Sequence, residues 1–245
     1  ILVIIYTVTG GTKAVNITQK QQMFVIMSGM FIIFFYILAN LPHEVDFSNV
    51  LHIAGANGKM DILDFSYNPE TRYTFWSGIT GGFFLMLSYF GTDQSQVGRY
   101  LSGKSIKESQ MGLIMNGLLK VPMQFFILLT GVMVFVFFQF NPVPLNFNPN
   151  NKAMIEKSAY KGEYNALEKK LDDLSEDKKV INLLYIDQLN QDYDNPTLRK
   201  ELVTLSNKEK DLRDRAKEII LKADSNSETN DKDYVFFHFI LNYLP

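Results

Sequence analysis

The chain has 245 residues, no cysteine and a formal net charge of −2. The lack of cysteine excludes disulfides and thiolate metal sites within it, and the balanced charge, with no basic stripe, argues against a nucleic-acid partner. Most of the charge lies in residues 152–233, which carry 16 Lys or Arg and 19 Asp or Glu. Because the sequence begins with Ile1, inside an apolar run, we expect it to be a piece of a longer chain.

Apolar runs predict membrane-spanning helices at residues 1–10, 21–42, 73–98 and 109–140, and residues 234–245 predict the start of the next one. A bilayer core requires about 20 apolar helical residues, so we interpret the first and last runs as truncated spans. Buried helices of a large soluble protein usually show a polar face, which these runs lack. The sequence therefore predicts an all-α polytopic membrane protein.

Basic residues in the short connections predict the orientation of these helices. Residues 11–20 and 99–108 are rich in Lys and Arg, which are retained on the cytoplasmic side. Alternation then makes residues 43–73 and 141–233 extracytoplasmic. We therefore expect a multi-pass protein of a cell membrane, in contact with the lipid bilayer.

The charged region 141–233 predicts a soluble helical-hairpin insert. Asn195 can cap a helix, Pro196 suits its first turn, and a turn is expected near residues 190–196. Leucine stripes mark the two helices: Leu167, Leu171, Leu174, Ile181 and Leu184 in the first, and Leu198, Leu202 and Leu205 in the second. The hairpin is either a partner-binding module or a solvated pair of helices sealed by these stripes, and we favour the second interpretation.

Glycines weaken the third apolar segment. Gly78, Gly81 and Gly82 lie within five positions, and each costs about 1 kcal/mol relative to alanine in a helix. Two interpretations stay open: close packing of helices through small residues, or a broken helix whose backbone faces a substrate cavity.

Lys120 has apolar residues on both sides, in an expected membrane span. An ionisable group at such a position usually faces a cavity or a partner, although it can also extend to the membrane surface. Lys107 is 13 residues away, roughly 20 Å of unbroken helix, so we favour a functional role. Asp93 can bind a cation, pair with Arg99 or be an ordinary helix-end carboxylate, and Tyr89 can line a cavity or anchor at the interface.

Two sets of residues stand out along the chain. The first consists of Gly10, Gly11, Lys13, Ala14, Val15, Thr18 and Gln22. The second consists of Tyr89, Phe90, Gly91, Asp93, Gln94, Arg99, Leu101, Lys104 and Ser105. In this order they resemble the signatures of the sodium/solute symporter family. The resemblance covers about residues 1–140 and resumes near residue 234, so it leaves the insert out.

The resemblance implies part of a LeuT-type inverted-repeat transporter that binds sodium and solute near the membrane midplane. In sugar-carrying relatives an aromatic at the position of Tyr89 covers the sugar, and a lysine at the position of Lys120 reaches a sugar hydroxyl. Met86 replaces an asparagine of those relatives, which removes a hydrogen-bonding amide. We therefore take Tyr89, Lys120, Met86 and Gln94 as candidate substrate-binding residues. Gln19 and Gly98 also depart from the family pattern.

The predicted function is sodium-coupled symport of a small polar organic solute, with a sugar or polyol favoured. Sodium is the coupling ion, its ligands are expected outside this chain, and no other cofactor is expected. The alternative is a membrane sensor that reuses the transporter fold, with the outer hairpin as its partner module. No nucleophile–base pair or metal-ligand spacing supports an enzyme, and His43, His52 and His238 are far apart in the sequence.

Overall fold

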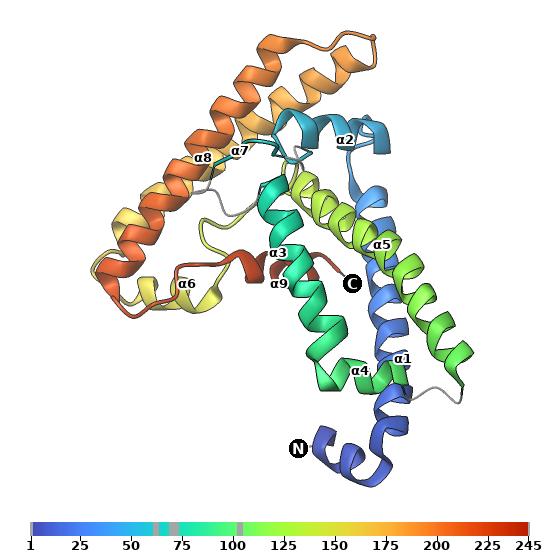
Figure 1. Cartoon of the computed structure of the whole chain (residues 1–245). Coiled ribbons are helices and arrows are strands. Elements are labelled where there is room, and N and C mark those ends of the chain that lie inside the picture. Colours follow the sequence, from blue (N-terminus) through green and yellow to red (C-terminus); the bar gives the residue numbers. More distant parts are fainter. Residues whose placement is uncertain (1, 61–63, 69–73, 102–104, 245) are drawn as a thin grey trace. The chain divides into compact units, whose positions relative to one another are not determined.

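A computed structural model describes residues 2–60, 64–68, 74–101 and 105–244, which form helices and their connections without any strand. The chain divides into two compact units, residues 1–32 with 61–129 and residues 33–60 with 130–245, and each is described by itself. Figure 1 labels the elements, which are α1 (Leu2–Asn40), α2 (Phe47–Ala56), α3 (Phe75–Leu87), the π-helical turn η1 (Ser88–Thr92), α4 (Gln94–Leu101), α5 (Ile106–Phe137), α6 (Pro149–Glu156), α7 (Lys161–Leu189), α8 (Pro196–Ala223) and α9 (Lys232–Tyr243).

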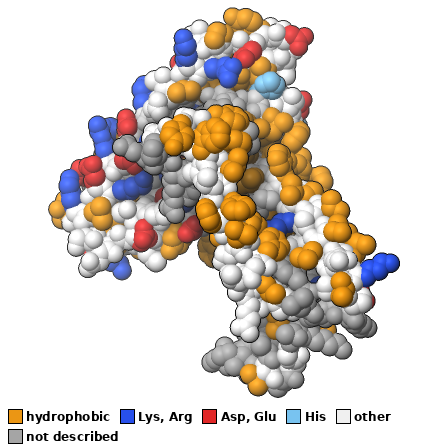
Figure 2. Space-filling model, viewed as in Figure 1, with side chains coloured by type: hydrophobic (Ala, Val, Ile, Leu, Met, Phe, Trp, Pro, Cys, Tyr) orange, Lys and Arg blue, Asp and Glu red, His pale blue; other side chains and the backbone are white. Residues whose placement is uncertain are grey.

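Two described helices, Ala14–Asn40 and Ile106–Phe137, are long and apolar enough to cross a membrane. They correspond to the spans expected at residues 21–42 and 109–140. Their apolar side chains are largely exposed, as those of Phe24 (74%) and Phe125 (69%) illustrate. Hydrophobic side chains also cover α3 and α5 in Figure 2. Such surfaces suit lipid rather than water.

Residues 11–20, which were expected to connect two spans, are helical from residue 12 onwards. α1 contains a kink at Gly11, whose φ of 56° is a left-handed conformation that glycine adopts without strain. After Gly11 the chain resumes a helix, and the Thr18 hydroxyl donates to the Ala14 carbonyl at 2.9 Å. The change of direction is therefore made by one residue instead of a loop.

The segment expected to span at residues 73–98 consists of α3, η1 and α4. Thr74 and Ser77 form a reciprocal capping box at the start of α3. The α-helix then continues through Gly78, Gly81 and Gly82 without a break, contrary to the broken-helix interpretation of these glycines. The chain departs from α-helical geometry directly after α3, at η1.

In the second unit, α7 and α8 form the predicted antiparallel hairpin (Figure 1). The Asn195 side chain accepts hydrogen bonds from the amides of Thr197 and Leu198, and Pro196 opens α8, which confirms the predicted helix start. The helices α2 and α6 were not predicted. α6 packs against both hairpin helices, and α2 does so as well.

One apolar cluster joins five helices of the second unit. It contains Ile37 of α1, Ile53 of α2, Phe137 of α5, Ile186 of α7 and Phe239 of α9, each at most 2% exposed. The rings of Phe137 and Phe239 meet edge to face with their centroids 5.1 Å apart. Burial of these side chains supplies the main stabilising contribution in this unit.

The seam between α7 and α8 is apolar at both ends and polar in the middle. Leu167 and Leu171 are buried towards one end, with Leu202 and Leu205 towards the other. Leu184 was expected in this seam but is 49% exposed. The helical repeat instead buries Lys178, Asn182 and Tyr185, which lie at the three- and four-residue spacing of a seam.

Glu209 balances the charge of the buried Lys178. The Lys178 ammonium lies 2.7 Å from Glu209 Oε2, and Arg213 Nε lies 3.0 Å from Glu209 Oε1. Burial would raise the pKa of Glu209, but the charges and hydrogen bonds of Lys178 and Arg213 outweigh it and lower that pKa below its ordinary 4.5. Arg213 also donates to the Leu145 carbonyl at 3.2 Å, so this ion cluster ties the hairpin to the segment after α5.

Glu209→Gln should destabilise the hairpin, because it leaves the Lys178 ammonium buried without a counter-charge. Loss of one partner of a buried pair costs about 3 kcal/mol or more, which corresponds to about hundredfold faster amide exchange. Hydrogen exchange of α7 and α8 in the intact protein measures this. The exposed pair Lys217–Asp214 provides the control, since Asp214→Asn should change exchange little.

Acid should reproduce the effect of Glu209→Gln. Because the pKa of Glu209 is lower in the folded protein than in the unfolded chain, its contribution is complete above 4.5 and is lost as the pH falls through the folded-state pKa. The assignment would be contradicted if the amides of Glu209→Gln exchanged at the wild-type rate. It would also be contradicted if acid accelerated exchange no more in wild type than in Glu209→Gln.

Asn182→Leu should stabilise the same seam. Asn182 is fully buried, and neither its Nδ2 nor its Oδ1 makes a hydrogen bond within the described structure. Replacing a buried unsatisfied polar group by an apolar one removes a penalty of about 1–3 kcal/mol, so amides of α7 should exchange more slowly. Leu184→Asn on the exposed face is the matched control and should have little effect. Faster exchange in Asn182→Leu would refute the prediction.

Candidate functional site

Tyr89 lies in η1, where the helix widens by one residue per turn. The Asp93 amide donates to the Ser88 carbonyl at 3.0 Å, five residues back, and the Thr92 hydroxyl donates to the same carbonyl at 3.0 Å. Single π-turns of this kind are frequent at functional sites. η1 carries the half-buried Tyr89 side chain out of the regular α3 repeat.

Lys120 of α5 meets Tyr89 in the first unit. Its ammonium lies 5.1 Å from the centroid of the Tyr89 ring, which is within the range of a cation–π contact. Two residues later, Pro122 lies inside α5 and lacks the amide hydrogen that would otherwise bond to the Leu118 carbonyl. A cation and a phenol thus meet in an otherwise apolar stretch, next to the proline of α5.

The other two candidate residues are less closely associated with this pair. Met86 lies in α3, three residues before Tyr89 of η1, and is 44% exposed. Gln94 is the first residue of α4 and is exposed. The described contacts join Tyr89 to Lys120 but do not include Met86 or Gln94.

Asp93 caps α4. Its carboxylate accepts from the Gln96 amide at 3.3 Å, and its carbonyl accepts from the Val97 amide at 2.9 Å. This agrees with the helix-end interpretation of Asp93. The side chains of Lys13 and Arg99 and the whole of Lys104 lie outside the described residues.

Sequence reasoning did not identify the two hydroxyl side chains of η1, Ser88 and Thr92, as part of the candidate site. The hydroxyls of Ser88 and Thr92 lie 3.4 Å apart, one turn from each other. Their four-residue spacing beside Gly91 was a usable signal, because short hydroxyl side chains at this spacing bond to backbone carbonyls inside helices.

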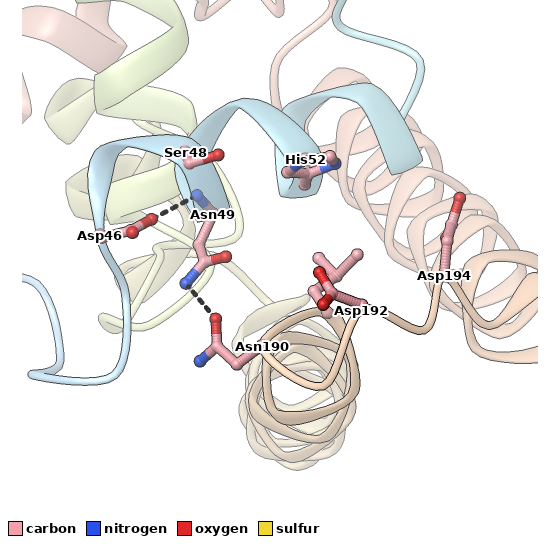
Figure 3. A pocket seen from close by; sticks show the side chains of 8 residues that line it. Asp46, Ser48, Asn49, His52, Asn190, Asp192 and Asp194 are labelled. Atoms are coloured by element: carbon pink, nitrogen blue, oxygen red, sulfur yellow. Dashed lines mark hydrogen bonds between the residues drawn. The ribbon is translucent and has the colours of Figure 1, made fainter.

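The other unit contains a concave surface. A polar pocket of about 450 Å³ lies between α2 and the α7–α8 turn, and Figure 3 shows its lining. Its carboxylates are largely used by the fold. Asp46 caps α2 through the Asn49 amide at 2.7 Å, while Asp194 accepts from the Tyr185 hydroxyl at 3.0 Å and from Arg199 at 3.1 Å. Its geometry is that of a structural junction.

Comparison with known proteins gives matches in one family. Residues 1–165 match the profile of the sodium:solute symporter family. The human sodium/iodide cotransporter is 34% identical over 113 residues, which cover 45% of this chain and 17% of that protein. Mouse sodium-coupled monocarboxylate transporter 2 is 35% identical over 111 residues, with coverages of 45% and 17%. The rabbit sodium-dependent multivitamin transporter is 35% identical over 103 residues, with coverages of 42% and 16%.

The matched region therefore spans about a sixth of these relatives, and no solved structure matches the chain. The relatives are named for iodide, monocarboxylates and vitamins, so they do not support the expected sugar or polyol. The family match extends through the candidate pair Tyr89–Lys120 and covers well over half of the chain. The chain belongs to the sodium:solute symporter family, whose members are multi-pass membrane transporters.

Proposed function

We propose that the chain forms part of a sodium-coupled symporter that carries a small monoanion, such as a short carboxylate or a halide, by alternating access. Sodium is the coupling ion, and no further cofactor is needed. Binding of ion and solute shifts the population between outward- and inward-facing states without a covalent step.

The Lys120–Tyr89 contact carries this proposal. Lys120 is the one ionisable residue in the sequence from Gly112 to Phe140, so its ammonium lies in a strongly apolar part of α5. A cation in such surroundings is costly unless it is paired. The Tyr89 ring compensates only part of that cost, whereas an anionic solute at the ammonium would compensate much more.

The neighbouring residues also favour an anion over a sugar. Met86 presents a thioether in place of a hydrogen-bonding amide, and an apolar wall suits the hydrocarbon part of a small carboxylate. A sugar needs several polar partners, of which Lys120, Tyr89 and Gln94 would supply few. Relatives named for iodide and monocarboxylates support the same choice.

The proposal includes the membrane topology predicted from the charged residues. Residues 11–20 and 99–108 are cytoplasmic in it, and residues 43–73 and 141–233 are extracytoplasmic. It also includes the LeuT-type inverted repeat, of which this chain would supply one part. Tyr89 and Lys120 would then line the cytoplasmic half of the solute pathway.

Lys120→Ala in the intact protein should weaken solute uptake. A hydrogen bond to a charged group contributes about 1.5–3 kcal/mol, so the half-saturating concentration of the transported anion should rise at least about tenfold. Uptake of labelled carboxylates, iodide, sugars and polyols into vesicles, with and without a sodium gradient, measures both the solute and the coupling.

Lys59→Ala is the matched control, because Lys59 makes a similar contact at 4.9 Å from the Phe135 ring but lies outside the candidate site. Its uptake should equal that of wild type. Sodium-driven uptake of a sugar or polyol instead of an anion would refute the proposed solute class. Absence of sodium-driven uptake across the whole panel would favour the sensor hypothesis.

A further inference from the structure

The hairpin formed by α7 and α8 is fastened to both ends of α2. At the start of α2, Asn49 Nδ2 donates to Asn190 Oδ1 at 3.3 Å, in the turn between the hairpin helices (Figure 3). Just beyond the end of α2, the Ser206 hydroxyl of α8 donates to Asn57 Oδ1 at 2.8 Å. A short helix bound at both of its ends cannot pivot on the hairpin without breaking one of these bonds.

Apolar burial fills the space between these two polar contacts. Ala56 of α2 packs in a cluster with Tyr185 of α7 and Leu202 of α8, and the latter two are at most 1% exposed. Ile186, one residue beyond Tyr185, is fully buried in the cluster that contains Ile37 of α1 and Phe137 of α5. The same turn of α7 therefore contacts α2 and also takes part in the core of the second unit.

A second set of contacts fastens the base of the hairpin. Arg213 of α8 donates to the Leu145 carbonyl and lies 5.2 Å from the Phe147 ring. The Phe147 amide donates to Asp231 Oδ2 at 2.8 Å, and Asn151 donates to the Glu228 carbonyl at 3.0 Å. The segments that enter and leave the insert are thus bonded to each other.

The start of α9 is held within the same unit. The Tyr36 hydroxyl of α1 donates to the Tyr243 carbonyl, and the Tyr243 hydroxyl donates to the Pro142 carbonyl after α5 at 3.1 Å. Phe239 lies in the central cluster, fully buried. Residues 33–40 of α1, residues 130–137 of α5 and α9 are therefore connected by the contacts of a single core.

We propose that the α7–α8 hairpin is an outer clasp: it stays docked on α2 through the transport cycle and keeps these ends of α1, α5 and α9 together as one rigid body. A hairpin that opened and closed as a gate would repeatedly expose Tyr185, Ile186 and Leu202, which are almost completely buried. Polar contacts at both ends of α2 would also have to break. Because the clasp is defined by what it does during a transport cycle, this proposal rests on the proposed function.

The test uses a cysteine pair, Asn57→Cys with Ser206→Cys, in the intact protein with any other cysteine replaced by serine. This chain itself contributes no cysteine. The two thiols are joined by oxidation or by a short bifunctional thiol reagent. We expect the same yield of cross-link without sodium, with sodium, and with sodium plus the solute, and we expect cross-linked protein to retain sodium-driven uptake.

Lys152→Cys with Glu168→Cys is the matched control. In this pair Lys152 Nζ lies 2.8 Å from Glu168 Oε1, and the contact joins α6 to α7 within the insert and does not involve α2. Loss of uptake on cross-linking residues 57 and 206, recovered on reduction and absent in the control pair, would overturn the clasp. A cross-linking yield that changes severalfold when sodium or solute is added would overturn it too.

Hydrogen exchange separates failure of the clasp from failure of the proposed function. If no sodium-driven uptake is found in any variant, the proposed function fails. The clasp is then judged by exchange and cross-linking alone. Protection of α2 and of residues 182–206 should be equal in all ligand conditions, and ligand-dependent loss of that protection would refute the clasp. Leu202→Asp should remove protection from α2 and the hairpin together, whereas loss confined to α8 would also refute it.

Discussion

Burial of one apolar cluster is the interaction on which the second unit depends. Ile37 and Phe137 come from helices whose other faces are also apolar, so hydrophobicity alone does not select their partners within a bilayer. Selection comes from shape, because the Phe137 ring meets Phe239 and Tyr243 edge to face at 5.1 and 5.0 Å. α2 and Ile186 complete the cluster and exclude water from it, and the positions of the hairpin and of α9 follow from this packing.

The sequence was sufficient to predict those helices whose signals are local. Apolar runs predicted the parts of α1 and α5 that are long enough to cross a membrane, although not that residues 12–20 continue α1, and the Asn195-Pro196 cap predicted where α8 begins, because hydropathy and capping depend on neighbouring residues. α2 was missed although Asp46 is a good cap, since ten residues gain little helical stability by themselves and depend on packing against α7 and α8. The prediction that Leu184 lies in the seam between α7 and α8 was wrong. The residues buried in that part of α7 include the polar Lys178 and Asn182, which a search for apolar spacing does not identify.

The candidate site shows the same difference between features that depend on neighbouring residues and features that depend on packing. Apolar neighbours drew attention to Lys120, but its proximity to Tyr89 was suggested only by family resemblance, because spacing along the chain does not say which helices meet. The π-helical turn could not be predicted either, since it differs from an α-helix by one hydrogen-bond register and its sequence carries no strong propensity. The roles of Met86 and Gln94 stay predictions, and their positions on α3 and α4 are compatible with a pathway that passes Tyr89.

Three lysines show how surroundings determine the use of one side chain. Lys178 is buried and carries its own counter-charge, Glu209, so it serves the fold and has no capacity for a ligand. Lys59 rests on the Phe135 ring but is exposed, so water can solvate its charge and the contact matters little. Lys120 also rests on a ring and is also exposed, but its exposed surface lies in the apolar middle of a helix suited to lipid, and its described contacts end with Tyr89. A ring stabilises an ammonium less than an anion does. The charge of Lys120 is therefore only partly compensated by the described residues, which is the condition a site for a transported anion must meet.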